Sequence, residues 1–279
     1  MRRFLFLLIV MALSGLGFAQ GIDRVRAAQE RLQQEGFYFG NKSGVYDSET
    51  SAAVTRFQIR RGLPINGKLD EATAKALGVP VAKANEGEAV ATSGTWRQMR
   101  NGDMQFLKKL NAGEIPPPAA PSRPAASVAP RKSVATTTAA RAATPAARTQ
   151  RSPFGTSPER LSDYVGAFVL AGLDPQVGSE LEFFAEKVDY FGERNVARSR
   201  IGRDLIRYAE RWPDRRFSLA GELKIERAAD QRVTVTFPLR YDLHNGRKHA
   251  AGEVWKTLTL RKAGADDYEI VAVNERKKR

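Results

Sequence analysis

The chain has no cysteine and only two histidines among its 279 residues. Without cysteine there can be no disulfide, no thiolate metal site and no lipid attachment at a bacterial lipobox. The histidines, His244 and His249, flank an Asn-Gly hairpin signal, and their spacing across a turn, with no third ligand nearby, is poor for zinc. We therefore expect no metal site and no cofactor, and neither an amidase zinc set nor a Cys–His transpeptidase pair.

Acidic residues are missing from a long central segment. No Asp or Glu lies between Glu114 and Glu159, where proline, alanine and basic residues accumulate. Such a composition cannot bury enough apolar area to offset its conformational entropy, so residues 81–156 are predicted to be a disordered basic linker. An amphipathic stretch within it predicts a short helix near 95–111, which either is transient or packs loosely on a neighbouring domain, or else docks on a partner. Its apolar residues are Trp96, Met99, Met104, Phe106, Leu107 and Leu110.

The N-terminus has the pattern of an export signal. A basic start is followed by an apolar run over 4–16 and by small residues at Gly17 and Ala19, which predicts a signal peptide over 1–19. An uncleaved membrane anchor is the alternative, but the run is shorter than the roughly 20 residues that span a bilayer. Losing Arg2 and Arg3 lowers the formal charge from +14 to +12. We expect a periplasmic or secreted protein that prefers anionic partners, and no nucleic acid, since no base-reading motif accompanies the charge.

An internal repeat dominates the next region. Residues 44–54 recur as 67–77, and in each copy a glycine turn and a large residue precede an Asp that opens a helix. The Asp carboxylate can accept the free N–H groups of the first helical turn. An amphipathic stretch with Val25, Ala28 and Leu32 on one face precedes both copies. The pattern predicts a small all-α domain of three helices over 20–80.

The order of these residues resembles the peptidoglycan-binding domain appended to bacterial wall hydrolases. The matching positions are Val25, Ala28, Gln29, Leu32, Gly36, Phe37, Tyr38, Gly44, Thr50, Ala53, Val54, Phe57, Gln58, Gly62, Leu63, Gly67, Thr73 and Leu77. Ser43 and Asn66 stand where the family favours Asp, and Asp47 and Asp70 replace Gly before the helices. The resemblance implies peptidoglycan as the partner.

The same resemblance suggests which side chains line a wall-binding groove. Tyr38 and Tyr46 are candidates to pack on sugar rings or peptide stems, while Arg56 and Gln58 offer hydrogen bonds. Two of these assignments have structural alternatives, because Gln58 can tie the Gly-rich loop to its helix and Tyr46 can fill the core.

Residues 157–276 are predicted to form an α+β domain. Helical periodicity covers 158–173, 177–188 and 198–212, and alternation with a period of two then predicts strands at 216–227, 232–243, 250–260 and 267–274. Asn245-Gly246 joins the second and third strands as a hairpin. Helices followed by an antiparallel run imply a sheet that curls around a helical face.

This order resembles the nuclear-transport-factor-2-like cone fold, with motifs at 184–192 and 208–213 and in the closing strands. The resemblance implies a cavity inside a curved antiparallel sheet, and a homodimer or an attached partner. Candidate residues of that pocket are Asp189, Tyr190, Tyr208, Trp212, Tyr241 and Trp255. Asp189 with Tyr190 is the one acid/base pair suggested, and its alternative is a surface cap.

The sequence thus predicts an exported, non-enzymatic peptidoglycan-binding protein without identified catalytic residues. Its C-terminal cone would bind a protein partner or a small ligand. Two alternatives stay open: the cone is an enzyme on a small substrate, or the whole chain is an interaction scaffold without affinity for the wall.

Overall fold

A computed structural model describes residues 21–81, 93–102 and 157–278 except positions 175, 229 and 265–266. The predicted signal peptide and most of the predicted linker lie outside the described residues, so those expectations stay predictions. Within the described part of the chain, no helix combines the length and apolar character needed to cross a bilayer.

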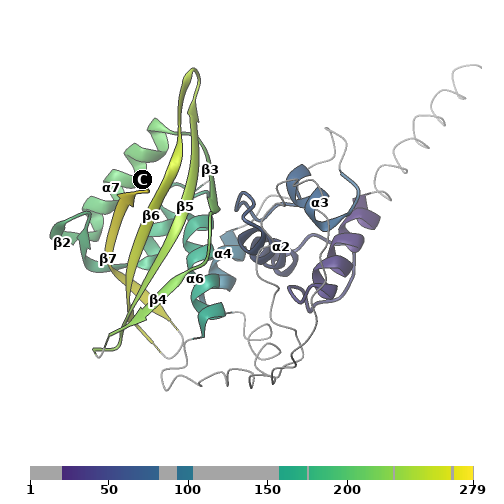
Figure 1. The fold of residues 1–279 in the computed structure, drawn as a ribbon, viewed down its shortest axis with the longest axis horizontal. Coiled ribbons are helices and arrows are strands. Elements are labelled where there is room, and N and C mark those ends of the chain that lie inside the picture. The colour runs from purple at the N-terminus through teal and green to yellow at the C-terminus, as the bar shows by residue number, and fades with distance from the viewer. Residues whose placement is uncertain are drawn as a thin grey trace, which may run out of the picture.

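The N-terminal unit is helical, as predicted. It consists of a helix over 21–34, α2 (Ser48–Arg61) and α3 (Glu71–Leu77) (Figure 1). The Asp47 carboxylate accepts from Thr50 N–H and the Asp70 carboxylate accepts from Thr73 N–H, which confirms the predicted helix openings. Apolar side chains from all three helices, among them Leu32, Phe57 and Leu77, form a small core of their own, to which Leu69 of the loop before α3 also belongs.

The C-terminal domain is a curled sheet with helices on one face. The strand order is β2-β1-β7-β6-β5-β3, with β4 pairing separately on β5. Its elements are α6 (Pro158–Ala171), the 3-10 helix η1 (Ser179–Phe183), β1 (Phe184–Tyr190), β2 (Glu193–Ala197), α7 (Arg198–Arg211), β3 (Asp214–Leu219), β4 (Lys224–Arg227), β5 (Arg232–Asn245), β6 (Lys248–Lys262) and β7 (Tyr268–Lys277).

The sheet confirms the predicted hairpin and has three more strands than the four predicted. β5 and β6 pair in register up to the turn at Gly246, which adopts a left-handed φ of 57°. The stretch predicted as one strand at 216–227 is divided into β3 and β4, and both pair with β5. β2 was not predicted, because its five residues are mostly exposed and carry no alternating apolar pattern.

The helix predicted over 177–188 is wrong. Only η1 is helical there, and the chain then continues as β1, whose residues pair with β2 on one side and run parallel to β7 on the other. Phe184 and Val188 are buried in the domain core from this strand. Sheet pairing with residues from the far end of the chain therefore overrides the local helical periodicity.

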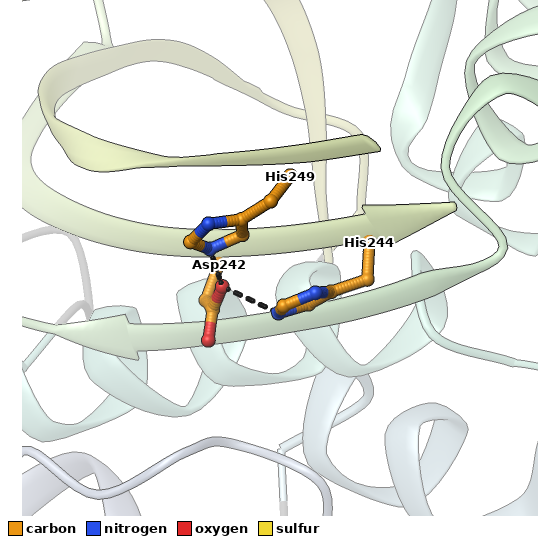
Figure 2. Close-up of side chains that lie close together, drawn as sticks. All are labelled: Asp242, His244 and His249. Carbon is orange, nitrogen blue, oxygen red and sulfur yellow. Dashed lines mark hydrogen bonds and ion pairs between the residues drawn. The ribbon is translucent and has the colours of Figure 1, made fainter. Parts of the chain in front are cut away.

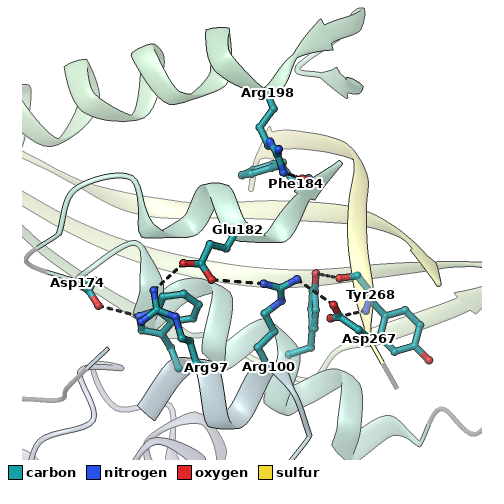
Figure 3. Close-up of polar contacts among 10 residues, drawn as sticks. Arg97, Arg100, Asp174, Glu182, Phe184, Arg198, Asp267 and Tyr268 are labelled. Atoms are coloured by element: carbon teal, nitrogen blue, oxygen red, sulfur yellow. Dashed lines mark hydrogen bonds and ion pairs between the residues drawn. The ribbon is translucent and has the colours of Figure 1, made fainter. Parts of the chain in front are cut away.

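A short helix from the predicted linker belongs to the packed structure. α4 (Ser93–Arg100) lies against α6 and α2 and buries Trp96 and Met99 completely. Polar contacts fasten it to the cone domain: Trp96 Nε1 donates to Asp174 at 2.8 Å, and Arg97 pairs with Glu182 at 2.7 Å (Figure 3). Of the two interpretations of this segment, packing on a neighbouring domain describes 93–100. The remainder of the predicted 95–111 helix falls almost entirely outside the described residues.

Arg100 extends the same network to the end of the sheet. Its guanidinium lies 3.1 Å from the Asp267 carboxylate and 3.8 Å from that of Glu182 (Figure 3). Tyr164 of α6 donates its hydroxyl to the carbonyl of Tyr268 at 2.9 Å, so polar contacts join α4 and α6 to the start of β7.

The N-terminal unit is docked on the cone domain through α2. The guanidinium of Arg56 bonds both carboxylate oxygens of Asp163 on α6 at 2.9 to 3.1 Å, and both side chains are at most 5% exposed. Ile59 packs so close to Gly166 that an added Cβ would collide with its Cδ1. Ile65 N–H donates to the carbonyl of Phe217 at 2.7 Å. The two units therefore share one buried interface.

Removing one partner of this ion pair should unfold the interface. Asp163→Ala is expected to lower the free energy of unfolding by about 3–5 kcal/mol, because it leaves the Arg56 guanidinium buried without its counter-charge. Urea denaturation measures the loss. The matched control is Arg61→Ala, which breaks the exposed pair with Glu35 and should cost less than about 1 kcal/mol. Equal costs for the two variants would contradict a stabilising role of the buried pair.

Candidate functional site

Two buried glutamines, Gln29 and Gln58, hold the two glycine loops of the N-terminal unit, which lie around Gly44 and Gly67. Gln29 holds the first loop. Its side-chain oxygen accepts from Gly44 N–H at 2.9 Å. Its amide donates to Thr50 Oγ1 and to the carbonyl of Val45, each at 3.0 Å. One fully buried side chain thus fixes the loop that precedes α2 and the first turn of that helix.

Gln58 repeats this arrangement for the second loop. Its oxygen accepts from the N–H groups of Asn66 and Gly67 at 3.0 Å, and its amide donates to Thr73 Oγ1 and to the carbonyl of Lys68 at the same distance. The internal repeat of the sequence is therefore a repeat of hydrogen-bond chemistry. In each copy, a glutamine of the preceding helix satisfies the backbone of a glycine loop.

The four side chains predicted to line a wall-binding groove have contacts inside the protein. Tyr38 is buried and donates to the Asn41 carbonyl at 2.8 Å, and burial raises the pKa of its hydroxyl. Tyr46 is half-buried and donates to the Gly67 carbonyl at 2.8 Å. Arg56 lies in the α2–α6 interface, and Gln58 holds the second loop. Their contact with peptidoglycan stays a prediction. The hydrogen bonds of Gln58 match the alternative stated for it, in which it ties the Gly-rich loop to its helix.

The exposed part of these loops lies beside the buried side chains. Lys42, Ser43 and Val45 are exposed around Gly44, and Val45 keeps 62% of its surface in solvent. The Tyr46 hydroxyl joins this loop to Gly67 of the second one, so both glycine loops form one edge of the unit. The exposed loop residues were not predicted as contacts, because the residues that match the family pattern are those that stabilise the loop.

Inside the cone, an apolar region gives way to a polar one. Val235, Phe237 and Leu258 are buried on the inner face of the sheet. Lys256, which pairs with Phe237 across the strands and therefore shares that face, forms an ion pair with Glu275 at 3.1 Å. Glu180 of η1 lies in the field of Lys256 and Arg215. None of these charged residues was among the predicted pocket positions.

Three of the predicted pocket residues join this polar end. Burial raises the pKa of Tyr190 and of Tyr208 to about 12, although Tyr208 keeps 38% of its surface in solvent, and the nearby carboxylates of Glu180 and Glu275 contribute in both cases. Tyr241 lies next to Tyr208. At neutral pH such hydroxyls keep their protons, so they act as hydrogen-bond donors and are unsuited to serve as general bases.

The other three predicted pocket residues lie elsewhere. Asp189 is exposed and accepts from Asn195 N–H at 3.1 Å in the β1–β2 turn, which corresponds to the surface-cap alternative. Trp255 is next to Lys256 in β6, so alternation places it on the outer face, where its ring lies 5.2 Å from Lys224 Nζ. Trp212 follows the end of α7 and packs with Arg211. The pairing of Asp189 with Tyr190 as an acid and base inside the cone is therefore wrong.

A cluster at the tip of the β5–β6 hairpin contains both histidines of the chain. His244 and His249 face each other across the strands, and their Nε2 atoms lie 2.9 and 2.8 Å from the same oxygen of Asp242 (Figure 2). The rings stack with centroids 4.4 Å apart. The hydrogen bond from His249 lowers the pKa of the Asp242 carboxyl. The expectation that no third ligand lies nearby is wrong, because strand alternation brings Asp242 to the same face.

Comparison with known proteins agrees with the two-unit architecture. Residues 22–77 match the family model of a peptidoglycan binding domain. The N-terminal unit is therefore a domain of the peptidoglycan-binding type, and the topology of the C-terminal domain is that of the expected cone. No curated protein matches the chain.

Solved structures are similar to parts of the chain at low identity. Bd1075 from Bdellovibrio bacteriovorus has 17% identity and a TM-score of 0.37, covering 43% of this chain and 41% of its own. Aln2 from a Streptomyces species has 15% identity and a TM-score of 0.35, covering 44% and 93%. The beta subunit of the benzoate 1,2-dioxygenase from Burkholderia mallei has 15% identity and a TM-score of 0.33, covering 41% and 89%.

The polar end of the cone should make stability depend on pH through Glu180. Burial is the main cause that raises the pKa of this carboxyl, so its protonated form favours the folded state at low pH. That contribution is lost as the pH rises through the raised pKa. Glu180→Gln, which is always neutral, should therefore gain stability relative to the wild type as the pH rises from about 4 to about 8.

Thermal unfolding at several pH values measures the difference between the two proteins. Glu226→Gln on the exposed strand β4 is the matched control and should show no such trend. A Glu180→Gln difference that is flat across the range, or that falls with rising pH, would contradict the assignment.

Proposed function

We propose that the protein is exported and non-enzymatic, and that it binds peptidoglycan through residues 22–77 while its cone domain binds a partner or a small ligand. The match of 22–77 to a peptidoglycan binding domain carries this proposal. The two complete glycine loops, each with its buried glutamine and its Asp-capped helix, support it further. Export rests on the signal pattern of residues 1–19.

The surface that touches the wall is the exposed edge of the glycine loops. Lys42 is exposed there, and Lys68 follows Gly67 in the second loop, so each glycine loop contributes a lysine near the contact between Tyr46 and Gly67. Ammonium groups pair with carboxylates such as those of peptidoglycan stem peptides. Val45 offers an exposed apolar side chain to the saccharide. We do not include Arg56 in the proposed surface, because its guanidinium is already paired with Asp163 of α6.

Docking of the two units gives the protein a defined geometry at the wall. The cone is held against α2, on the interface made by Arg56 and Ile59, and does not hang from a tether. Peptidoglycan bound at the glycine loops would thus place the cone at a fixed position relative to the polymer.

The polar end of the cone favours ligand binding as the task of the second domain. Protonated tyrosines, the Lys256–Glu275 pair and the half-buried Glu180 provide donors and acceptors beside an apolar interior. Because Tyr190 and Tyr208 hold their protons at neutral pH, recognition of a polar ligand suits these groups better than proton abstraction does.

Sedimentation with purified sacculi tests the wall-binding function. The mature chain over 20–279 should pellet with sacculi, and Lys42→Glu with Lys68→Glu should weaken binding at least about tenfold, since two charge-assisted contacts are lost. The control is Lys75→Glu with Lys187→Glu, which makes the same change of net charge at exposed positions away from the loops.

The control variant should pellet like the wild type. Equal loss in both double variants would show that net charge alone drives association, as in a basic scaffold. Failure of the wild type to pellet would refute wall binding.

A further inference from the structure

The hairpin tip of β5 and β6 has a group of metal-ligating side chains that belong neither to the N-terminal unit nor to the cone interior. The Gly246-Arg247 turn places His244 and His249 opposite each other, one pair beyond Asn245 and Lys248. In a hairpin with a two-residue loop this second pair is not hydrogen-bonded, so its side chains approach closely. Asp242 lies two residues before His244 and therefore on the same face.

We propose that Asp242, His244 and His249 form a binding site for a divalent first-row transition-metal ion such as Zn²⁺. One ligand atom from each residue lies within 4.8 Å of the others. Ligands around a tetrahedral zinc ion at about 2.0–2.1 Å are separated by about 3.3–3.4 Å. Small rotations of three side chains, without movement of the paired strands, bring the donors to that spacing.

The chemistry of the donors fits such an ion. Imidazole nitrogens suit zinc, copper and nickel, and a carboxylate adds a negative charge that offsets part of the ion's charge. In the structure both histidines direct Nε2 toward the Asp242 carboxylate (Figure 2). A bound metal ion would take the place of the protons between these atoms. Each histidine would then carry its proton on Nδ1. Three protein ligands on a half-exposed surface leave further positions for water.

The neighbouring strand adds charges of both signs. Asp214 of β3 lies opposite His244, and Arg216 lies opposite Asp242. Asp214 favours a cation beside the histidine, whereas Arg216, whose guanidinium lies 3.9 Å from the Asp214 carboxylate, adds a positive charge that opposes one. The site is therefore expected to bind more tightly after Arg216→Gln, which removes this positive charge and leaves all three ligands in place.

The composition of the chain makes the test specific. The protein has no cysteine, and these are its only histidines, so every imidazole signal of an untagged mature chain reports this cluster. Zn²⁺ titration followed by calorimetry should give one ion per chain. Imidazole ¹⁵N NMR should show both Nε2 resonances shifting in step with the titration, and the melting temperature should rise with zinc concentration.

Variants separate this site from other carboxylates. His249→Gln and Asp242→Asn should each weaken zinc binding at least about tenfold. Asp230→Asn, on an exposed turn of the same domain, is the matched control and should bind like the wild type. Circular dichroism of each variant checks that the sheet is intact.

Three results would overturn the proposal. Zinc uptake that leaves the imidazole resonances unchanged would mean that the ion binds elsewhere. No uptake at all would mean that the cluster is only a hydrogen-bonded clasp on the hairpin. One ion per two chains, with dimers in sedimentation velocity, would mean that zinc bridges separate molecules.

Discussion

The buried ion pair between Arg56 and Asp163 determines how this molecule is put together. A guanidinium and a carboxylate that are both almost fully removed from water are stable only while they stay together. Because one belongs to α2 of the N-terminal unit and the other to α6 of the cone domain, the pair fixes the two units against each other. Ile59 against Gly166, and the hydrogen bond from Ile65 to Phe217, complete the same interface.

This interface changes the meaning of the segment between the units. The residues described on either side of 103–156 belong to α4 and α6, which contact each other. The segment therefore connects neighbouring helices, and the distance between the glycine loops and the cone does not depend on its length. The N-terminal unit, α4 and the cone are better understood as one body than as modules on a tether.

The N-terminal unit could be predicted from the sequence because its determinants are local. Asp47 and Asp70 cap helices a few residues away, and each glycine loop is satisfied by a glutamine of the preceding helix. The docking of α2 could not be predicted, since Arg56 and Asp163 are more than 100 residues apart and nothing in the local pattern links them. For the same reason β1 was taken for a helix, as its partner β7 lies at the far end of the chain.

The candidate sites show the same division. Tyr190 and Tyr208 lie near the same two carboxylates, Glu180 and Glu275, and Tyr241 lies next to Tyr208, while their role in a pocket stays a prediction. The position of Trp255 follows from the alternation of side chains along β6, and the histidine cluster follows from the pairing of β5 with β6 across the hairpin. The number of residues between the histidines does not by itself give either result. Lys256 and Glu180 were missed because charged residues in a strand or a short 3-10 turn usually face water.

The docked arrangement can be measured directly, because the absence of cysteine allows spin labels at two introduced cysteines without background. Exposed positions such as Lys75 on α3 and Lys187 on β1 place one label on each unit. Pulsed electron resonance should give a single narrow distance distribution in the mature chain, and a broad one after Asp163→Ala. A broad distribution in the unmodified background would contradict the docked arrangement, since it would mean that the two units move independently in solution.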